Sequence, residues 1–214
     1  MRLVLPRLYV ILDAGMLTDP AEETAQKLMD AGVKLLQYRA KNAAARELWN
    51  ESRAIAEAAL RAKCIFLVND RPDVAYLAGA DGVHVGQDDL DVEQARKVIG
   101  PDRWVGVSTH NLEQFEKAAA SSADYIAVGP IFHTSSKANP DPVVGTELLP
   151  RVRALTGKPI VAIGGITLER AAGVLAAGAD SVAVISDILK AKDPAAMARE
   201  FILRLDAVKP AASH

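Results

Sequence analysis

The chain has 214 residues, of which 50% are hydrophobic, 24% are charged and 5% are aromatic, and its formal net charge is -2. This balance excludes a disordered or fibrous protein, and it gives no electrostatic reason to expect nucleic acid or a membrane surface as a partner. The sequence has no apolar run of the roughly 20 residues that span a bilayer. The single cysteine, Cys64, excludes a disulfide framework and a cysteine zinc cluster, and it indicates a reducing, cytoplasmic compartment.

Short apolar segments alternate with longer helix-like segments between an irregular lead-in at 1–7 and a tail at 209–214 that we expect to be frayed. The apolar segments are rich in Val, Ile and Leu, which is typical of strands buried on both faces. They cover residues 8–12, 35–39, 65–69, 82–85, 104–107, 125–128, 160–163 and 181–185. The segments between them, such as 43–63 and 168–177, carry apolar residues at three- and four-residue spacing and predict helices.

A short motif recurs before the second, fourth, sixth and eighth strands. It reads Ala-Gly-Val at 31–33, Ala-Gly-Ala-Asp at 78–81 and 177–180, and Ser-Ala-Asp at 122–124. Eight strands that alternate with helices imply parallel pairing through right-handed crossovers. The sequence therefore predicts an α/β fold, a single (β/α)8 TIM barrel that forms one domain over residues 1–214. An open doubly wound sheet with the same number of strands is the alternative.

Polar residues cluster where the second strand ends. Gln37, Arg39 and Lys41 alternate along the chain, so the period of two places all three on one face. Burying an amide or a cation without a binding partner costs several kcal/mol for each group. An anion at the barrel mouth would be such a partner. A strand end with long side chains extended into water is the alternative.

Carboxylates follow the next two strands. Asp70 comes directly after the third strand, and Asp88 and Asp89 follow the fourth. Asp70 and Asp89 together could share one Mg²⁺, whose remaining ligands are usually waters and substrate phosphate oxygens. Alternatively, Asp70 caps the following helix. We interpret Asp88 and Asp91 as residues at a helix start, where they complement the helix dipole.

Three later segments add phosphate-binding chemistry. Ser108 ends the fifth strand, and the loop at 129–145 carries the hydroxyls of Thr134, Ser135 and Ser136 beside Lys137. A disordered polar loop is the alternative for that segment. After the seventh strand, Gly164-Gly165 allows the backbone to approach an anion closely, at a place where many barrels bind phosphate. We interpret His84 as a core residue and His110 as a solvent-facing loop residue, with a general acid or base as the alternative for His110.

These motifs predict two phosphate-binding regions in one barrel mouth, one cationic and metal-assisted and the other neutral and built from amides. Taken in order, they resemble the thiamine-phosphate synthase family from about residue 8 to residue 189. The motifs that carry the resemblance are Gln-Tyr-Arg-Ala-Lys at 37–41, Asn-Asp at 69–70, Gly-Val-His-Val-Gly-Gln-Asp-Asp at 82–89, Val-Ser-Thr-His at 107–110, Thr-Ser-Ser-Lys at 134–137, Ile-Gly-Gly-Ile at 163–166 and Val-Ile-Ser at 184–186.

The resemblance implies an enzyme that condenses a pyrimidine methyl diphosphate with a thiazole phosphate and releases diphosphate. It assigns the metal, Mg²⁺, to Asp70 and Asp89. It assigns the pyrimidine diphosphate to Gln37, Tyr38, Arg39, Ala40, Lys41, Asn69, Ser108 and Lys137, with Arg39, Lys41, Ser108 and Lys137 as the catalytic set. It assigns the thiazole phosphate to Thr134, Ser135, Ser136, Gly165, Ile185 and Ser186.

Two positions depart from the family pattern. Ser136 stands where many relatives have threonine, and Asp187 adds a negative charge where a small residue is commoner. Two other functions remain open at this point: a thiazole tautomerase of the same superfamily, which needs only the monophosphate region, and a regulator that binds a phosphometabolite without turnover. The expected partners are small-molecule substrates, and the sequence leaves open whether the chain forms a homo-oligomer.

Overall fold

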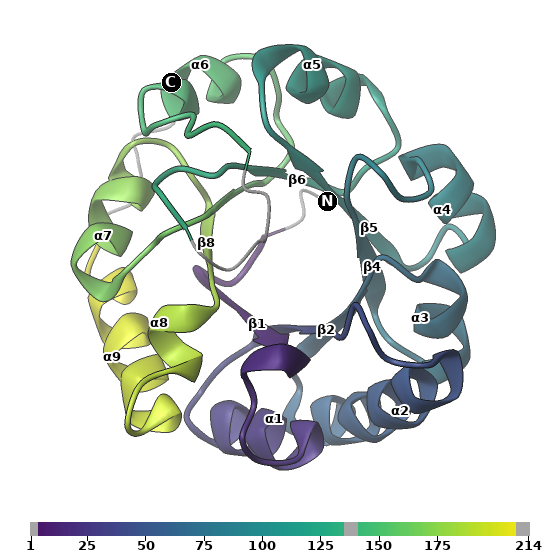
Figure 1. Ribbon diagram of the computed structural model, residues 1–214. Coiled ribbons are helices and arrows are strands. Elements are labelled where there is room, and N and C mark those ends of the chain that lie inside the picture. Colours follow the sequence, from purple (N-terminus) through teal and green to yellow (C-terminus); the bar gives the residue numbers. More distant parts are fainter. Residues whose placement is uncertain (1–3, 135–140, 209–214) are drawn as a thin grey trace.

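The computed structural model describes residues 4–134 and 141–208. The predictions for the tail and for Ser135, Ser136 and Lys137 lie outside these residues. Eight parallel strands form a closed barrel (Figure 1) in which β1 pairs with both β2 and β8. The predicted TIM barrel is confirmed, and the open sheet is wrong. The strands are β1 (Leu8–Asp13), β2 (Leu35–Arg39), β3 (Ile65–Asn69), β4 (Gly82–Val85), β5 (Trp104–Thr109), β6 (Tyr125–Val128), β7 (Ile160–Ile163) and β8 (Ser181–Val184).

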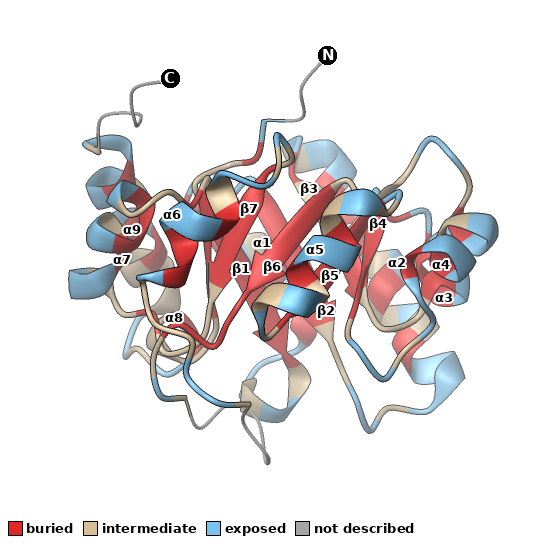
Figure 2. Ribbon diagram, turned by 90° about the horizontal axis from the view of Figure 1, so that it is seen from above, coloured by how far each residue is buried: buried red, intermediate tan, exposed pale blue. Residues whose placement is uncertain are grey.

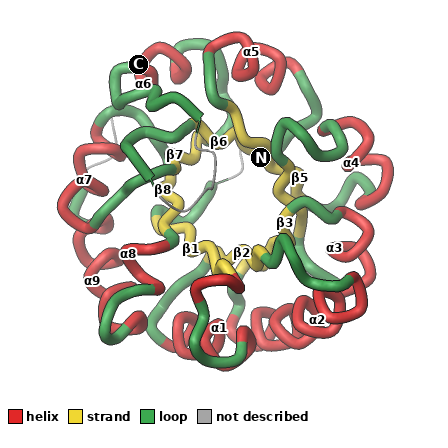
Figure 3. Tube along the Cα trace, viewed as in Figure 1, coloured by secondary structure: helices red, strands yellow, loops and turns green. Residues whose placement is uncertain are grey.

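Helices surround this ring of strands on the outside (Figure 3). They are the short 3-10 helix η1 (Ala14–Met16) and α1 (Ala21–Asp30), α2 (Ala45–Ala62), α3 (Pro72–Ala78), α4 (Val92–Ile99), α5 (Leu112–Ala120), α6 (Leu148–Arg153), α7 (Leu168–Ala176), α8 (Ser186–Leu189) and α9 (Pro194–Asp206). Within residues 4–134 and 141–208, no helix has the length and apolarity that crossing a membrane requires.

The strands separate two apolar cores, because successive side chains point to opposite faces. In β1, Leu8, Val10 and Leu12 pack outward against the helices, whereas Tyr9 and Ile11 point into the barrel. Figure 2 shows the result, with buried strands and helices that expose only their outer faces. The same alternation directs residues near the strand ends into the mouth of the barrel, the end at which the strands finish.

The repeated motif has a structural cause at the opposite end of the barrel. Asp81, Asp124 and Asp180 each accept a backbone N–H from the start of a neighbouring strand, at Phe66 (2.8 Å), Val105 (2.7 Å) and Ile160 (2.8 Å). Arginines from the surrounding helices pair with two of these carboxylates, as Arg96 does with Asp124 and Arg153 with Asp180. The motif therefore satisfies backbone donors far from the mouth, and it contributes to stability rather than to chemistry.

Candidate active site

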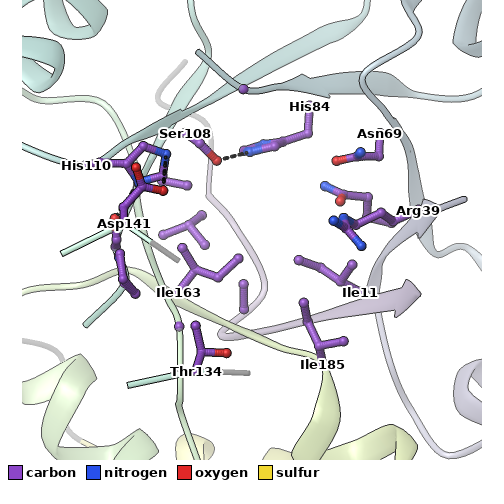
Figure 4. A pocket seen from close by; sticks show the side chains of 18 of the residues that line it. Ile11, Arg39, Asn69, His84, Ser108, His110, Thr134, Asp141, Ile163 and Ile185 are labelled. Carbon is purple, nitrogen blue, oxygen red and sulfur yellow. Dashed lines mark hydrogen bonds and ion pairs between the residues drawn. The ribbon is translucent and has the colours of Figure 1, made fainter. Parts of the chain in front are cut away.

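A cavity of about 390 Å³ opens at the mouth of the barrel, and all eight strands contribute to its lining. The sequence-predicted residues that line it are Gln37, Arg39, Lys41, Asn69, Asp70, Asp89, Ser108, Thr134, Gly165, Ile185 and Ser186. In Figure 4, Arg39 and Asn69 lie together at one side of the cavity and Thr134 lies apart from them. Apolar side chains that include Ile11, Val161 and Ile163 complete the lining.

The cationic side of the cavity is built on the end of β2. Gln37, Arg39 and Lys41 all line the cavity, as their alternation predicts. The guanidinium of Arg39 pairs with the carboxylate of Asp13, and the Nζ of Lys41 lies 3.7 Å from Oδ2 of Asp70. Both cations therefore stand beside carboxylates, so an incoming diphosphate must compete with these carboxylates or be helped by a further positive charge.

Asp70 and Asp89 lie close enough for their carboxyl groups to interact directly. Burial, and then the hydrogen bond and negative charge of Asp89, raise the pKa of Asp70 to about 6, although Lys41 and Arg39 oppose the shift. Asp70 does not cap α3, since no side chain caps the start of that helix. Two adjacent carboxylates fit Mg²⁺, which takes one or two carboxylates and fills its other positions with water and phosphate oxygens.

Tyr38 and Ala40 do not line the cavity, although they lie within the predicted binding segment. The alternation of β2 turns Tyr38 outward, where it is buried and its hydroxyl donates to Glu51 of α2 (2.5 Å). Ala40 packs against the outer core. The side chain of Tyr38 turns away because only every second residue of a strand faces the barrel interior. The assignment of Tyr38 and Ala40 to the pyrimidine diphosphate stays a prediction.

A chain of buried hydrogen bonds, which the sequence did not predict, runs beneath the cavity. Gln37 Nε2 donates to the Tyr9 hydroxyl (2.5 Å), which lies 3.1 Å from the Tyr125 hydroxyl. His84 connects this hydroxyl through Nδ1 (2.8 Å) to Ser108 Oγ through Nε2 (2.8 Å). The interpretation of His84 as a core histidine is confirmed, since 7% of it is exposed. The sequence did hold a signal for this chain of hydrogen bonds, because Tyr9 and Tyr125 stand at inward-facing positions of two otherwise aliphatic strands.

One direction of donation satisfies every member of this chain. Gln37 donates to Tyr9, Tyr9 to Tyr125, and Tyr125 to Nδ1 of His84, whose Nε2–H then donates to Ser108. Burial raises the pKa of both tyrosine phenols well above the ordinary value, so they remain protonated. In this arrangement the Ser108 hydroxyl keeps its own proton for donation to an acceptor in the cavity.

The other histidine of this region, His110, lies in the cavity wall rather than facing solvent as predicted. Its Nδ1 lies 2.6 Å from the carbonyl oxygen of Gly129, and its Nε2 lies 3.5 Å from a carboxylate oxygen of Asp141. Figure 4 shows the His110–Asp141 pair across the cavity from Arg39. The sequence interpretation failed because Asp141 is distant in the chain and reaches His110 only through the loop that follows β6.

The neutral side of the cavity is built from backbone rather than charge. Gly165 has φ +62°, and a Cβ there would lie 2.2 Å from the carbonyl oxygen of His133, so the position requires glycine. Ser186 begins α8 beside it. Asp187 does not point its charge into the cavity lining, because its carboxylate accepts the N–H of Leu168 at the start of α7 (2.9 Å). It thus caps the start of α7, whose own N-cap residue, Thr167, makes no side-chain capping hydrogen bond.

Comparisons with known proteins agree on one family. A family model described as thiamine monophosphate synthase matches residues 8–188. A thiamine-phosphate synthase from Koribacter versatilis is 53% identical over 205 residues, covering 94% of this chain and 96% of the relative. One from Chlorobium phaeovibrioides is 42% identical over 201 residues, with 94% and 95% covered. A solved thiamine phosphate pyrophosphorylase from Pyrococcus furiosus gives a TM-score of 0.86 at 32% identity, covering 95% of this chain and 96% of that one. The chain belongs to the thiamine monophosphate synthase family.

Proposed function

We propose that this chain is the alkyl transferase that makes thiamine phosphate. It joins 4-amino-2-methyl-5-(diphosphooxymethyl)pyrimidine to 4-methyl-5-(2-phosphooxyethyl)thiazole, or to the carboxylated thiazole. It releases diphosphate, and CO2 as well when the thiazole is carboxylated. The relatives named thiamine-phosphate synthase support this reaction. The observation that carries the proposal in the structure is a single cavity with a cationic, carboxylate-bearing side and a neutral, glycine-bearing side. Such a cavity suits two phosphorylated substrates whose rings meet between the phosphoryl groups.

In this reaction, the C–O bond between the pyrimidine methylene and the diphosphate breaks, and the diphosphate oxygen keeps the electron pair. The thiazole nitrogen donates its lone pair to the same carbon and forms the new C–N bond. The protein therefore has to stabilise negative charge on the departing oxygens. We assign this task to Arg39, Lys41 and Lys137, with Asn69 and the Ser108 hydroxyl as further polar contacts.

Asp70 and Asp89 would hold Mg²⁺ on the same side of the cavity. The metal, when bound, supplies positive charge to the departing diphosphate. The apolar lining between the two polar sides keeps water from the pyrimidine carbon, which would otherwise capture water instead of the thiazole. Gly165, Ile185 and Ser186, together with Thr134, Ser135 and Ser136, would hold the thiazole phosphate through amides and hydroxyls.

The two alternative functions, a thiazole tautomerase and a regulator without turnover, do not explain the cationic side of the cavity. A thiazole tautomerase has no diphosphate to stabilise, and a regulator without turnover needs no charge placed for a leaving group. We further propose one domain over residues 1–214 and a cytoplasmic enzyme that acts on small molecules, in keeping with the single buried cysteine, Cys64.

The test is release of diphosphate and formation of thiamine phosphate from the two substrates, with and without Mg²⁺. We expect turnover only with the metal, and a decrease in kcat of at least about 100-fold for Asp70→Asn and for Lys137→Ala, the usual scale for one charge stabiliser. Asp73→Asn is the matched control, because Asp73 lies on α3 outside the cavity and pairs with Arg71. Near-normal rates for both cavity variants would contradict the proposal.

A further inference from the structure

Asp13 is a charged residue beside the cavity that neither the sequence motifs nor the family assignment includes. It is the last residue of β1, and the register pairs it directly with Arg39, the last residue of β2. Only 11% of its side chain and 19% of the Arg39 side chain are exposed, and the two groups form an ion pair. Because the pair is largely buried, its attraction is screened far less than that of a surface pair.

The backbone fixes the orientation of the Asp13 carboxylate. Its Oδ1 accepts the N–H of Gly15 (3.0 Å), so Asp13 caps the short helix η1 that follows β1. Its other oxygen, Oδ2, accepts from the NH1 group of Arg39. One carboxylate oxygen is therefore held by the backbone of η1, and the other holds a guanidinium that lines the cavity.

Without this partner, Arg39 has a competing position. Arg39 and Asp70 line the same cavity, and the Nζ of Lys41, two residues further along the chain, lies 3.7 Å from Oδ2 of Asp70, so this carboxylate is another acceptor on the cationic side. A long, unheld arginine side chain also loses rotamer entropy when it becomes ordered. The ion pair with Asp13 fixes the guanidinium before a ligand arrives, and four of its five N–H groups remain for other acceptors.

We propose that Asp13 is a positioning residue for the reaction: its carboxylate holds the Arg39 guanidinium toward the departing diphosphate and away from Asp70. This inference rests on the proposed function for the identity of the anion. Asp13 itself touches no substrate, and it acts through Arg39. Misplacement of a catalytic group by about 1 Å costs on the order of 100-fold in rate, so the loss of the ion pair has a measurable consequence.

The experiment is a double-mutant cycle with Asp13→Asn, Arg39→Ala and the double variant. Asparagine keeps an oxygen for the Gly15 N–H and removes the charge that holds Arg39, which separates the helix cap from the ion pair. We expect Asp13→Asn to lower kcat about 10- to 100-fold, and to lower it no further in the Arg39→Ala background. Asp73→Asn, which removes an exposed aspartate–arginine pair outside the cavity, is the control and should leave kcat unchanged.

The affinity for inorganic diphosphate, measured by calorimetry on the same four proteins, tests the inference without turnover. When Arg39 is present, we expect Asp13→Asn to weaken diphosphate binding at least about threefold. When Arg39 is replaced by alanine, we expect Asp13→Asn to have no effect on diphosphate binding. Equal or tighter binding by Asp13→Asn, or losses that multiply in the double variant, would overturn the inference. A wild-type protein that binds diphosphate but forms no thiamine phosphate would contradict the proposed function alone, and the binding cycle would still decide the role of Asp13.

Discussion

Lowering the pH should destabilise this protein through one buried imidazole. Burial lowers the pKa of His84 to about 4 from an ordinary 6.5, with a small opposing attraction from Asp89 and a small reinforcing repulsion from His110. As the pH falls, the unfolded chain binds the proton first, so the stability contributed by neutral His84 is present above 6.5 and is lost on the way to 4. The difference of about 2.5 pKa units corresponds to roughly 3 kcal/mol, of which roughly 2 kcal/mol is lost between pH 7 and pH 5.

The assay is denaturant unfolding of the wild type and of His84→Gln at pH 7 and pH 5. The substitution has its own cost at both values, so the quantity of interest is the change of each unfolding free energy with pH. We expect the wild type to lose roughly 2 kcal/mol more than the variant over this interval. A histidine-edited NMR titration supplies a direct check, since the chain has only four histidines and the variant identifies the His84 signal.

A His84 signal that titrates near pH 6.5, or equal pH dependence of the two unfolding free energies, would refute this reasoning. Such a result would mean that water reaches the imidazole and that the hydrogen-bond chain from Gln37 to Ser108 is open. A protonated His84 donates from both nitrogens, so it can no longer accept from Tyr125. The direction of donation that leaves the Ser108 proton for the cavity therefore requires the neutral imidazole.

Two further substitutions test the packing and the neutral side of the cavity. In Gly106→Ala, the new Cβ would lie 2.0 Å from the ring of Tyr125, so we expect a loss of at least about 1–3 kcal/mol in the free energy of unfolding, measured by denaturation. In Asp187→Ala, the N–H of Leu168 loses its acceptor, so we expect a loss of about 1 kcal/mol. Because the Asp187 carboxylate lies outside the cavity lining, the same variant should leave KM for both phosphorylated substrates unchanged; a changed KM for the thiazole phosphate alone would contradict this placement.

The barrel could be predicted because its signals are local. Each strand is a short run of β-branched and aliphatic residues between two segments with helical spacing of apolar residues. Alternation along β2 correctly predicted that Gln37 and Arg39 share one face, which lines the cavity. The same rule, applied to every residue of the segment, would also have excluded Tyr38 from the mouth. Asp70, Asp89 and Ser108 could be predicted as site residues because the active sites of such barrels lie at the ends of the strands and in the loops that follow them.

The interactions within the cavity could not be predicted, because they depend on the register between strands. Asp13 reads in the sequence only as a polar residue that ends an apolar run, and its role appears once β1 is placed against β2 with Asp13 opposite Arg39. The connection of His84 to Tyr125 likewise joins strands that are not neighbours in the barrel order. Such contacts depend on the register between strands and on the direction of each side chain inside the barrel, which no local pattern encodes.

In the proposed function, Asp70 and Asp89 hold a divalent cation that binds together with diphosphate. Binding of Mn²⁺, followed by electron paramagnetic resonance in the presence and absence of inorganic diphosphate, tests it most directly. We expect diphosphate to tighten Mn²⁺ binding to the wild type and to Asp73→Asn, and we expect Asp70→Asn and Asp89→Asn each to abolish the effect. Unchanged, diphosphate-dependent binding in both cavity variants would contradict it.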